Sequence, residues 1–356
     1  MKSNKRLLSL LMAAVILVGV ISGCGVSSTP PSSQAPAPGG SSEAPAPAPA
    51  GKATSLTICG TNGVGDTQSM AHEELAKRLN ALGGWNAVAM VSSEMGSTDD
   101  VTEQAINGAA VIAASDPARI AAYVPEIGIL MMPYLFSDYA QLDSLQETAL
   151  YKEWCDKLRE EGLILLANNC LTGWRNWVTN KEITKPADLN GLKIRTMGSA
   201  IATNSVNAMG AIATPMNQNE AYNAIATKVI DGGEWQIPTI HSSKFYEVCK
   251  NISLSQHFLL TGSIVAGTKW FDTLSEQQKT ELTTNAVQTY KDNQAIVVDY
   301  EQKYLKEMED AGVKVTTPDR EAFKAATAHL YSDMNTTGGV DFEALRTELY
   351  KQLGIN

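Results

Sequence analysis

Several features that define whole classes of proteins are scarce in this 356-residue chain. It has only 5 Cys, which excludes a small secreted scaffold stapled by disulfides. The 28 Lys+Arg are outnumbered by 38 Asp+Glu, and a net charge of −10 disfavours a nucleic-acid binder, which needs a basic surface. Aromatic residues make up only 6%, but the apolar fraction of 44% is normal for a globular protein and excludes wholesale disorder. At about 150 residues per domain, the length predicts about two domains.

Long apolar runs are also scarce, and the one at the N-terminus is too short for a membrane-spanning helix. Basic residues 2, 5 and 6 precede an apolar run over residues 7–21, which at about 15 residues is short of the roughly 20 that a span needs. Residues 1–23 are therefore predicted to be a signal peptide. Residues 21–24 (Ile-Ser-Gly-Cys) resemble a bacterial lipobox, which implies cleavage before Cys24 and lipidation of its sulfur. An ordinary signal peptide with a chance cysteine, or a retained signal anchor, is the alternative.

The segment after Cys24 has the composition of a linker. Residues 24–54 consist mainly of Pro, Ala, Ser and Gly, which lack the apolar bulk for a core and favour extended conformations. At about 3.1 Å per residue, such a linker could hold a domain up to ~85 Å from the membrane. We therefore predict an extracytoplasmic, lipid-anchored domain in the periplasm or on the outer face of the plasma membrane. This location makes ATP and NAD poor candidates as cofactors, and we predict none.

From residue 55 onward, strand-like and helix-like patterns alternate, which predicts parallel βαβ units. Strands are expected at 56–59, 87–91, 111–114, 163–167, 177–179 (as an edge strand), 193–196, 229–231, 252–255 and 263–266. Helices are expected at 68–82, 97–108, 200–209 and 217–225, with a single turn near 186. A long helix from about 275 to 310 would outspan one small lobe and therefore bridge two.

The predicted fold class is thus α/β, with two lobes of the periplasmic-binding-protein type. Residues 55–172 with about 263–305 form the first lobe, and residues 173–262 with about 306–356 form the second lobe and C-terminal helices. Ligands in such folds bind at strand ends and helix N-termini. The glycine-rich segment 60–66 either lines such a crevice or is a plain loop.

Catalytic and metal motifs are missing from the sequence. None of the four His lies in an HExxH motif, and no GxSxG elbow is present. The cysteines after residue 24 have no metal-binding spacing, and their apolar settings suggest buried small side chains: Cys59, Cys155, Cys170 and Cys249. The protein is therefore predicted to be no enzyme and to hold no metal.

Two arginines and a tryptophan are the strongest binding candidates. Arg195 lies at the end of the strand 193–196, where its planar fork could grip a carboxylate; Arg175 lies between two tryptophans that could hold it by stacking. Trp235 follows the predicted strand 229–231. For each arginine the alternative is a surface ion pair, and for Trp235 a place in the core.

From residue 55 to the C-terminus the chain resembles the solute-binding proteins of tripartite ATP-independent periplasmic (TRAP) transporters, the DctP family. The matching segments are 93–96 with the helix after it, 123–126, 132–136, 191–195, 220–222, 229–232 and 244–248. The resemblance implies a receptor that captures a small organic acid between two lobes. It would deliver this acid to small and large integral membrane subunits for uptake driven by an ion gradient.

The resemblance also implies roles for individual residues. Arg195 stands where the family clamps the ligand carboxylate, and Arg175 matches a second family arginine. Trp235 occupies a slot that holds Asn in sialic-acid-binding members, which suggests a smaller or flatter ligand, and Asp116 stands where those members place an acidic contact.

The sequence departs from the family at one further position. Gln218, beside Asn217, replaces the common aromatic residue, so the far end of the ligand stays open. The identity of the acid and of the coupling ion is open too, with a monomer as the default. An ABC-type or sensory receptor, or less plausibly a surface hydrolase, is the alternative function.

Overall fold

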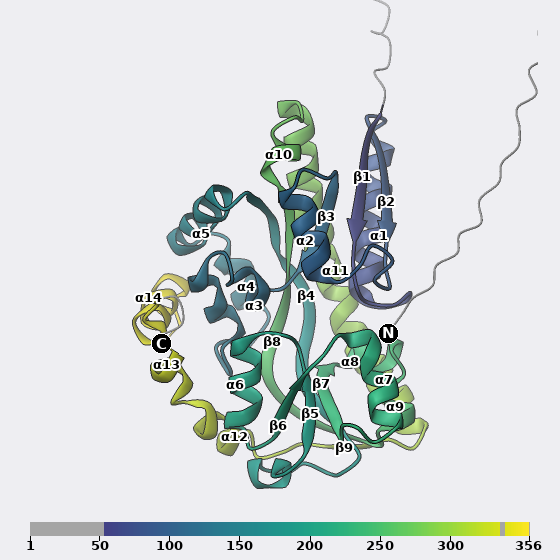
Figure 1. Ribbon diagram of the computed structural model, residues 1–356, viewed down its shortest axis with the longest axis vertical. Coiled ribbons are helices and arrows are strands. Elements are labelled where there is room, and N and C mark those ends of the chain that lie inside the picture. The colour runs from purple at the N-terminus through teal and green to yellow at the C-terminus, as the bar shows by residue number, and fades with distance from the viewer. Residues whose placement is uncertain (1–52, 335–338, 356) are drawn as a thin grey trace, which may run out of the picture. The chain divides into compact units, whose positions relative to one another are not determined.

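Two long strands, β4 (Leu163–Thr179) and β8 (Asn251–Gly267), form the middle of a mixed sheet (Figure 1). In the computed structural model, which describes residues 53–334 and 339–355, nine strands belong to this sheet. Its order is β2-β1-β3-β8-β4-β7-β5-β6, and β9 pairs with β8. The remaining strands are β1 (Thr54–Cys59), β2 (Trp85–Met90), β3 (Val111–Ser115), β5 (Lys193–Thr196), β6 (Ile212–Pro215), β7 (Gly232–Gln236) and β9 (Lys314–Thr316).

The long strands connect two groups of parallel strands. At one end β3 pairs with the C-terminal part of β8, and β1 pairs in parallel with both β2 and β3. At the other end β7 pairs with the C-terminal half of β4, and β5 pairs in parallel with β6 and β7. The parallel βαβ units are therefore confirmed, but β4 and β8 are antiparallel to their partners β3, β7 and each other.

Helices surround the sheet, with α1 beside β1 and β2 and with α6 to α9 around the opposite end in Figure 1. In chain order they are α1 (Thr67–Ala81), α2 (Thr98–Ile106), α3 (Pro117–Ile120), η1 (Pro125–Met131), α4 (Ala140–Leu145), α5 (Ala149–Glu160), η2 (Pro186–Leu189), α6 (Ala200–Ala208), α7 (Gln218–Ala226), α8 (Ile237–Ser242), α9 (Phe245–Val248), α10 (Thr268–Phe271), α11 (Glu276–Asp310), α12 (Arg320–Thr327), α13 (Leu330–Asp333) and α14 (Phe342–Leu353).

Helix α11 is the predicted long helix. Ser275 caps it in a capping box with Gln278, and its 35 residues span about 52 Å at 1.5 Å per residue. Its first half contributes Tyr290 to a core with α1 and β1, whereas its last turns contribute Met308 to a separate core with α8 and β7. One helix therefore packs into the cores at both ends of the sheet. The lobe boundaries given above stay a prediction.

The strand prediction is wrong in four respects. Segments 163–167 and 177–179 are parts of the single strand β4, and 252–255 and 263–266 are parts of β8. The polar residues between them interrupted the apolar pattern, although Asn168 and Asn176 are buried. Trp177 is also no edge residue, because β4 pairs with β7 on one side and β8 on the other. The predicted strand 229–231 is a turn, and β7 begins at Gly232.

The signal peptide, Cys24 and almost all of the linker lie outside the described residues. Within the described part, no helix is long and apolar enough to cross a membrane. The four described cysteines are free thiols, and the expected burial is confirmed for Cys59, Cys170 and Cys249, whereas Cys155 is half-buried.

Candidate functional site

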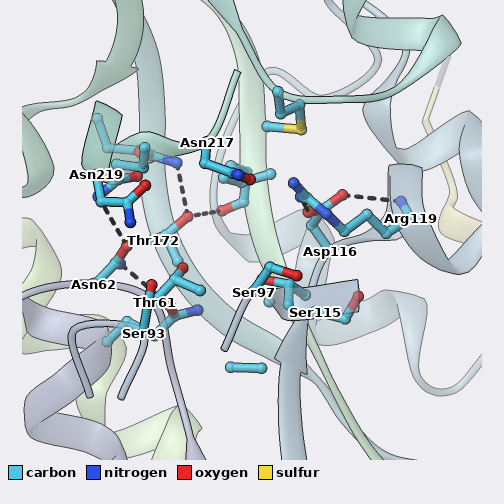
Figure 2. A pocket seen from close by; sticks show the side chains of 18 of the residues that line it. Thr61, Asn62, Ser93, Ser97, Ser115, Asp116, Arg119, Thr172, Asn217 and Asn219 are labelled. Carbon is cyan, nitrogen blue, oxygen red and sulfur yellow. Dashed lines mark hydrogen bonds and ion pairs between the residues drawn. The ribbon is translucent and has the colours of Figure 1, made fainter. Parts of the chain in front are cut away.

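A cavity of about 290 Å³ lies where strand ends and helix N-termini meet (Figure 2). The N-terminal residues of α2 and α7 reach its wall through Ser97 and Asn217, and the ends of β3 and β5 contribute Ser115 and Arg195. Backbone N–H groups at helix N-termini favour anions. The segment 60–66 also reaches this wall with Thr61, so it lines the cavity rather than forming a plain loop.

Arg195 is a buried cation in the cavity wall. Its side chain comes from β5, which pairs with β7 so that Arg195 lies opposite Gly233. Its Nε donates to the carbonyl of Met216 at 3.2 Å, and its guanidinium carbon lies 5.2 Å from the centre of the Trp235 ring. Among the described residues, no carboxylate forms an ion pair with it. Burial first, and then repulsion by Arg175, lower the pKa of Arg195 to about 9, so it remains charged at neutral pH.

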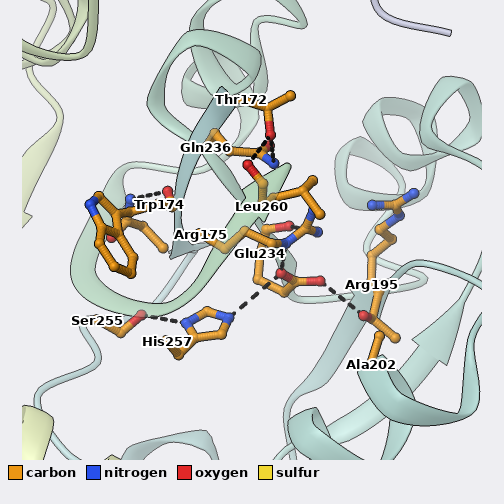
Figure 3. Close-up of polar contacts among 12 residues, drawn as sticks. Thr172, Trp174, Arg175, Arg195, Ala202, Glu234, Gln236, Ser255, His257 and Leu260 are labelled. Atoms are coloured by element: carbon orange, nitrogen blue, oxygen red, sulfur yellow. Dashed lines mark hydrogen bonds and ion pairs between the residues drawn. The ribbon is translucent and has the colours of Figure 1, made fainter. Parts of the chain in front are cut away.

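Arg175 also lines the cavity, but its charge is already compensated (Figure 3). Its Nε donates to the carboxylate of Glu234 and its Nη2 to the Glu234 carbonyl. Glu234 also accepts from Thr196 Oγ1 at 2.9 Å, and His257 Nε2 lies 3.5 Å away. Burial alone would raise the pKa of Glu234, but Arg175 and His257 lower it to about 2. The predicted stacking of Arg175 on tryptophan is therefore replaced by a buried ion pair.

Trp235 is not at a strand end and does not line the cavity. It lies inside β7, is fully buried and stacks on Phe245 with ring centres 4.0 Å apart. A Cβ on Gly233 would come within 2.1 Å of its ring, so only glycine leaves room for it. The expectation of a flat ligand rested on Trp235 as a contact and loses its basis. Its ring instead supports Arg195 from behind.

Asp116 lies in the cavity wall, paired with an arginine that the sequence interpretation missed. It caps α3, accepting from the backbone N–H of Arg119, and its carboxylate forms an ion pair with the Arg119 side chain (Figure 2). Arg119 is half-buried and also contacts the exposed carboxylate of Asp99 at 3.2 Å. The spacing Asp-Pro-x-Arg could have predicted this pair, because a capping Asp and a residue three positions later share one face.

Gln218 and Asn217 line the cavity as well, at the start of α7. Gln218 Nε2 donates to Asn62 Oδ1 at 3.3 Å, which connects α7 with the loop before α1. Asn62 in turn donates to Asp66 Oδ1 at 3.0 Å. Asp66 is buried and accepts from Thr239 Oγ1 at 3.0 Å, so a polar network joins α1 to α7 and α8. Burial raises the pKa of Asp66.

Neutral polar groups form the floor between these walls. Gln236 Nε2 donates to Thr172 Oγ1 at 3.1 Å, and Thr172 Oγ1 donates to the carbonyl of Leu260 at 2.9 Å (Figure 3). Gln236 lies opposite Arg175 in the pairing of β7 with β4. In the sequence, Gln236 and Thr172 were visible only as polar residues within strands. Polarity by itself does not distinguish a cavity wall from an exposed face.

The described residues hold no group of three or more His, Cys, Asp or Glu side chains that could bind a metal ion. Among the described residues, the site combines one cation without a carboxylate partner, two internal ion pairs, the exposed carboxylate of Asp100 and a wall of hydroxyl and amide groups. Such an arrangement can bind a small polar anion and orient it.

The chain matches a known family of proteins. Residues 60–337 match the family model of bacterial extracellular solute-binding protein family 7, DctP. The 2,3-diketo-L-gulonate-binding periplasmic protein YiaO of Escherichia coli is 32% identical over 70% of this chain and 73% of its own length.

Solved structures agree with this match. A TRAP solute-binding protein from Ochrobacterium anthropi with bound L-fuconate has 31% identity and a TM-score of 0.78, covering 84% of this chain and 100% of the other. One from Fusobacterium nucleatum with bound sn-glycerol-3-phosphate has 25% identity and a TM-score of 0.80, covering 84% and 98%. The chain belongs to the DctP family, the extracellular solute-binding proteins of TRAP transporters.

Proposed function

We propose that this protein binds the charged group of a small organic acid at Arg195, inside the cavity described above. The observation that supports this role is a buried guanidinium in the cavity wall that has no carboxylate partner among the described residues. An unpaired buried charge is costly, and an incoming anion would offset that cost. Arg175, Asp116, Gln218 and Asn217 would complete the site, whereas Trp235 would support Arg195 without contacting the ligand.

The family works as transporter receptors and not as enzymes, and its members bind small organic acids for membrane permease subunits. The relatives described above are named for a sugar acid or have a sugar acid or a phosphate ester bound, and each of these is an anion. In this chain, ligand binding would close the two predicted lobes around the cavity by a hinge motion, because the closed state makes more contacts with the ligand.

Thermal unfolding with a panel of organic acids tests the binding role. A ligand at 100 times its dissociation constant adds about 2.7 kcal/mol of apparent stability, which is easily measured. We expect at least one carboxylic acid to raise the melting temperature of the wild-type protein and to have no effect on Arg195→Met. An unchanged melting temperature with every acid would contradict the proposal.

Anchoring is a separate part of the proposal. The Ile-Ser-Gly-Cys sequence supports lipidation at Cys24 after removal of residues 1–23, with residues 25–53 as the tether of a monomeric receptor, because β1 begins at Thr54. Membrane fractionation with radiolabelled palmitate would test this. Wild-type protein should carry label and sediment with membranes, and Cys24→Ala should lose both properties. Label on Cys24→Ala would refute the assignment, and sedimentation velocity would test the monomer.

A further inference from the structure

The charges around the cavity leave room for one negative charge on the ligand. Three arginines line the cavity, namely Arg119, Arg175 and Arg195. The Arg175 charge is compensated by Glu234, and the Arg119 charge by Asp116 together with the exposed Asp99. A further carboxylate, Asp100, lines the cavity at an exposed position, where it caps α2 with Ser97. Only Arg195 lacks a carboxylate partner among the described residues.

A second negative charge on the ligand would have no cation to meet. A dicarboxylate or a doubly charged phosphate ester would carry that charge into a partly enclosed cavity, where an uncompensated charge is disfavoured. The Asp116 carboxylate in the wall would also repel it. A single carboxylate, in contrast, would pair with the Arg195 fork, the guanidinium of this wall that has no carboxylate partner among the described residues.

The rest of the wall favours hydroxyl groups. More than half of the lining residues carry a neutral hydroxyl or amide, and none of the described lining residues is aromatic. An amide offers both a donor and an acceptor, as a ligand hydroxyl does, whereas a carboxylate only accepts. Three of these residues have free capacity: the side chains of Asn217 and Asn219 and the Oε1 atom of Gln236 make no hydrogen bond with the described residues.

From these observations, and resting on the proposed function, we propose that the ligand is a polyhydroxylated monocarboxylic acid. Its carboxylate would pair with Arg195, and its hydroxyls would bond to amide and hydroxyl side chains such as Gln236, Thr172 and Asn217. The cavity of about 290 Å³ lies at the lower end of the roughly 300–1,000 Å³ range of small-molecule pockets, which suits a compact ligand such as a sugar acid.

Isothermal titration of the purified protein with matched compounds tests this class. The monoacids are gluconate, galactonate, glucuronate and galacturonate, which cover several stereochemistries. The comparison compounds are galactarate (a second carboxylate), hexanoate (no hydroxyls), galactitol (no charge), succinate and sn-glycerol-3-phosphate. We expect at least one sugar monoacid to bind at least tenfold tighter than every comparison compound.

Removal of the Asp116 charge provides a second, independent test, in which the measured quantity is the preference for a diacid over a monoacid. Asn caps helices as well as Asp does, so Asp116→Asn keeps the α3 cap but leaves Arg119 without its buried partner. The variant should raise the affinity for galactarate relative to galactonate at least tenfold compared with wild type. An unchanged ratio would overturn the charge argument.

Different results would overturn the monoacid proposal and the proposal of an anion receptor at Arg195. Tightest binding of galactarate, succinate, hexanoate or sn-glycerol-3-phosphate, lost in Arg195→Met, would overturn the monoacid proposal and keep the anion receptor. Binding that Arg195→Met does not weaken, or no binding by any compound, would overturn both.

Discussion

Replacing Arg195 by Met should abolish ligand binding without destabilising the ligand-free protein, which is the opposite of what a structural arginine would do. Charge-assisted hydrogen bonds contribute about 1.5–3 kcal/mol each. A carboxylate gripped by two of them would lose roughly 3–6 kcal/mol of binding energy, which is a factor of about 10² to 10⁴ in Kd.

The cost to the folded protein is much smaller. The lowering of the Arg195 pKa to about 9 corresponds to a penalty on the order of 5 kcal/mol for holding the charge in the ligand-free protein. The variant loses the bond to the Met216 carbonyl and the contact with the Trp235 ring, together roughly 3–4 kcal/mol. The penalty is slightly larger than these losses, so the unfolding free energy of Arg195→Met should equal that of wild type or exceed it by up to about 2 kcal/mol.

Urea unfolding of the ligand-free protein and calorimetric titration with the best-binding acid measure the two quantities separately. Arg159→Met is the matched control, because Arg159 is exposed and pairs only with Asp272 among the described residues. It should leave the affinity unchanged. Ligand binding by Arg195→Met as tight as that of wild type, or a loss of several kcal/mol of stability in the ligand-free variant, would contradict this prediction.

Three further results follow from buried polar groups. Glu234→Gln should lower the unfolding free energy at pH 7 by about 3 kcal/mol, because Arg175 is left unpaired. The pKa of Glu234 is lowered to about 2, so its contribution to the unfolding free energy of wild type should be complete above about pH 4.5 and fade toward pH 2. Urea unfolding at several pH values measures this, and equal acid sensitivity of wild type and Glu234→Gln would contradict it. Burial lowers the pKa of His72 to about 4, so between pH 6.5 and 4 the unfolded chain binds a proton that the folded chain does not. Over this range the unfolding free energy of wild type should fall by up to about 3 kcal/mol more than that of His72→Gln. Parallel stability curves would refute that. Thr239→Val removes a hydrogen bond to Asp66 and should cost about 1 kcal/mol in urea unfolding, whereas no loss would mean that this contact between α8 and α1 is unimportant.

Local sequence patterns were sufficient to predict the helices whose apolar residues recur with a clear helical period. The helix 68–82 corresponds to α1, and the capping box at Ser97 begins α2 as expected. The long helix from Ser275 has the predicted length and ends at Asp310. In these segments the signal lies within a few residues of the element it predicts, so no knowledge of distant partners is needed.

The pattern failed where buried strands carry polar residues. In β4 the run from Asn168 to Asn176 looks like a break, yet it is one continuous strand between β7 and β8. Its polar side chains are buried because they reach partners from other strands or face the cavity, as Thr172 does toward Gln236 and Leu260. Period-two alternation cannot reveal such partners, because they lie far away in the sequence.

The sequence alone determined the class of fold, the alternation of elements and Arg195 as the leading candidate for the binding cation, since strand, turn and motif all lie around that residue. Only the tertiary structure decided which arginine keeps a free charge. Glu234 is 59 residues from Arg175, and their ion pair exists only because β7 lies beside β4. The same pairing buries Trp235 in the core. Charge balance in a cavity depends on which distant side chains the sheet brings together, and no local pattern contains that information.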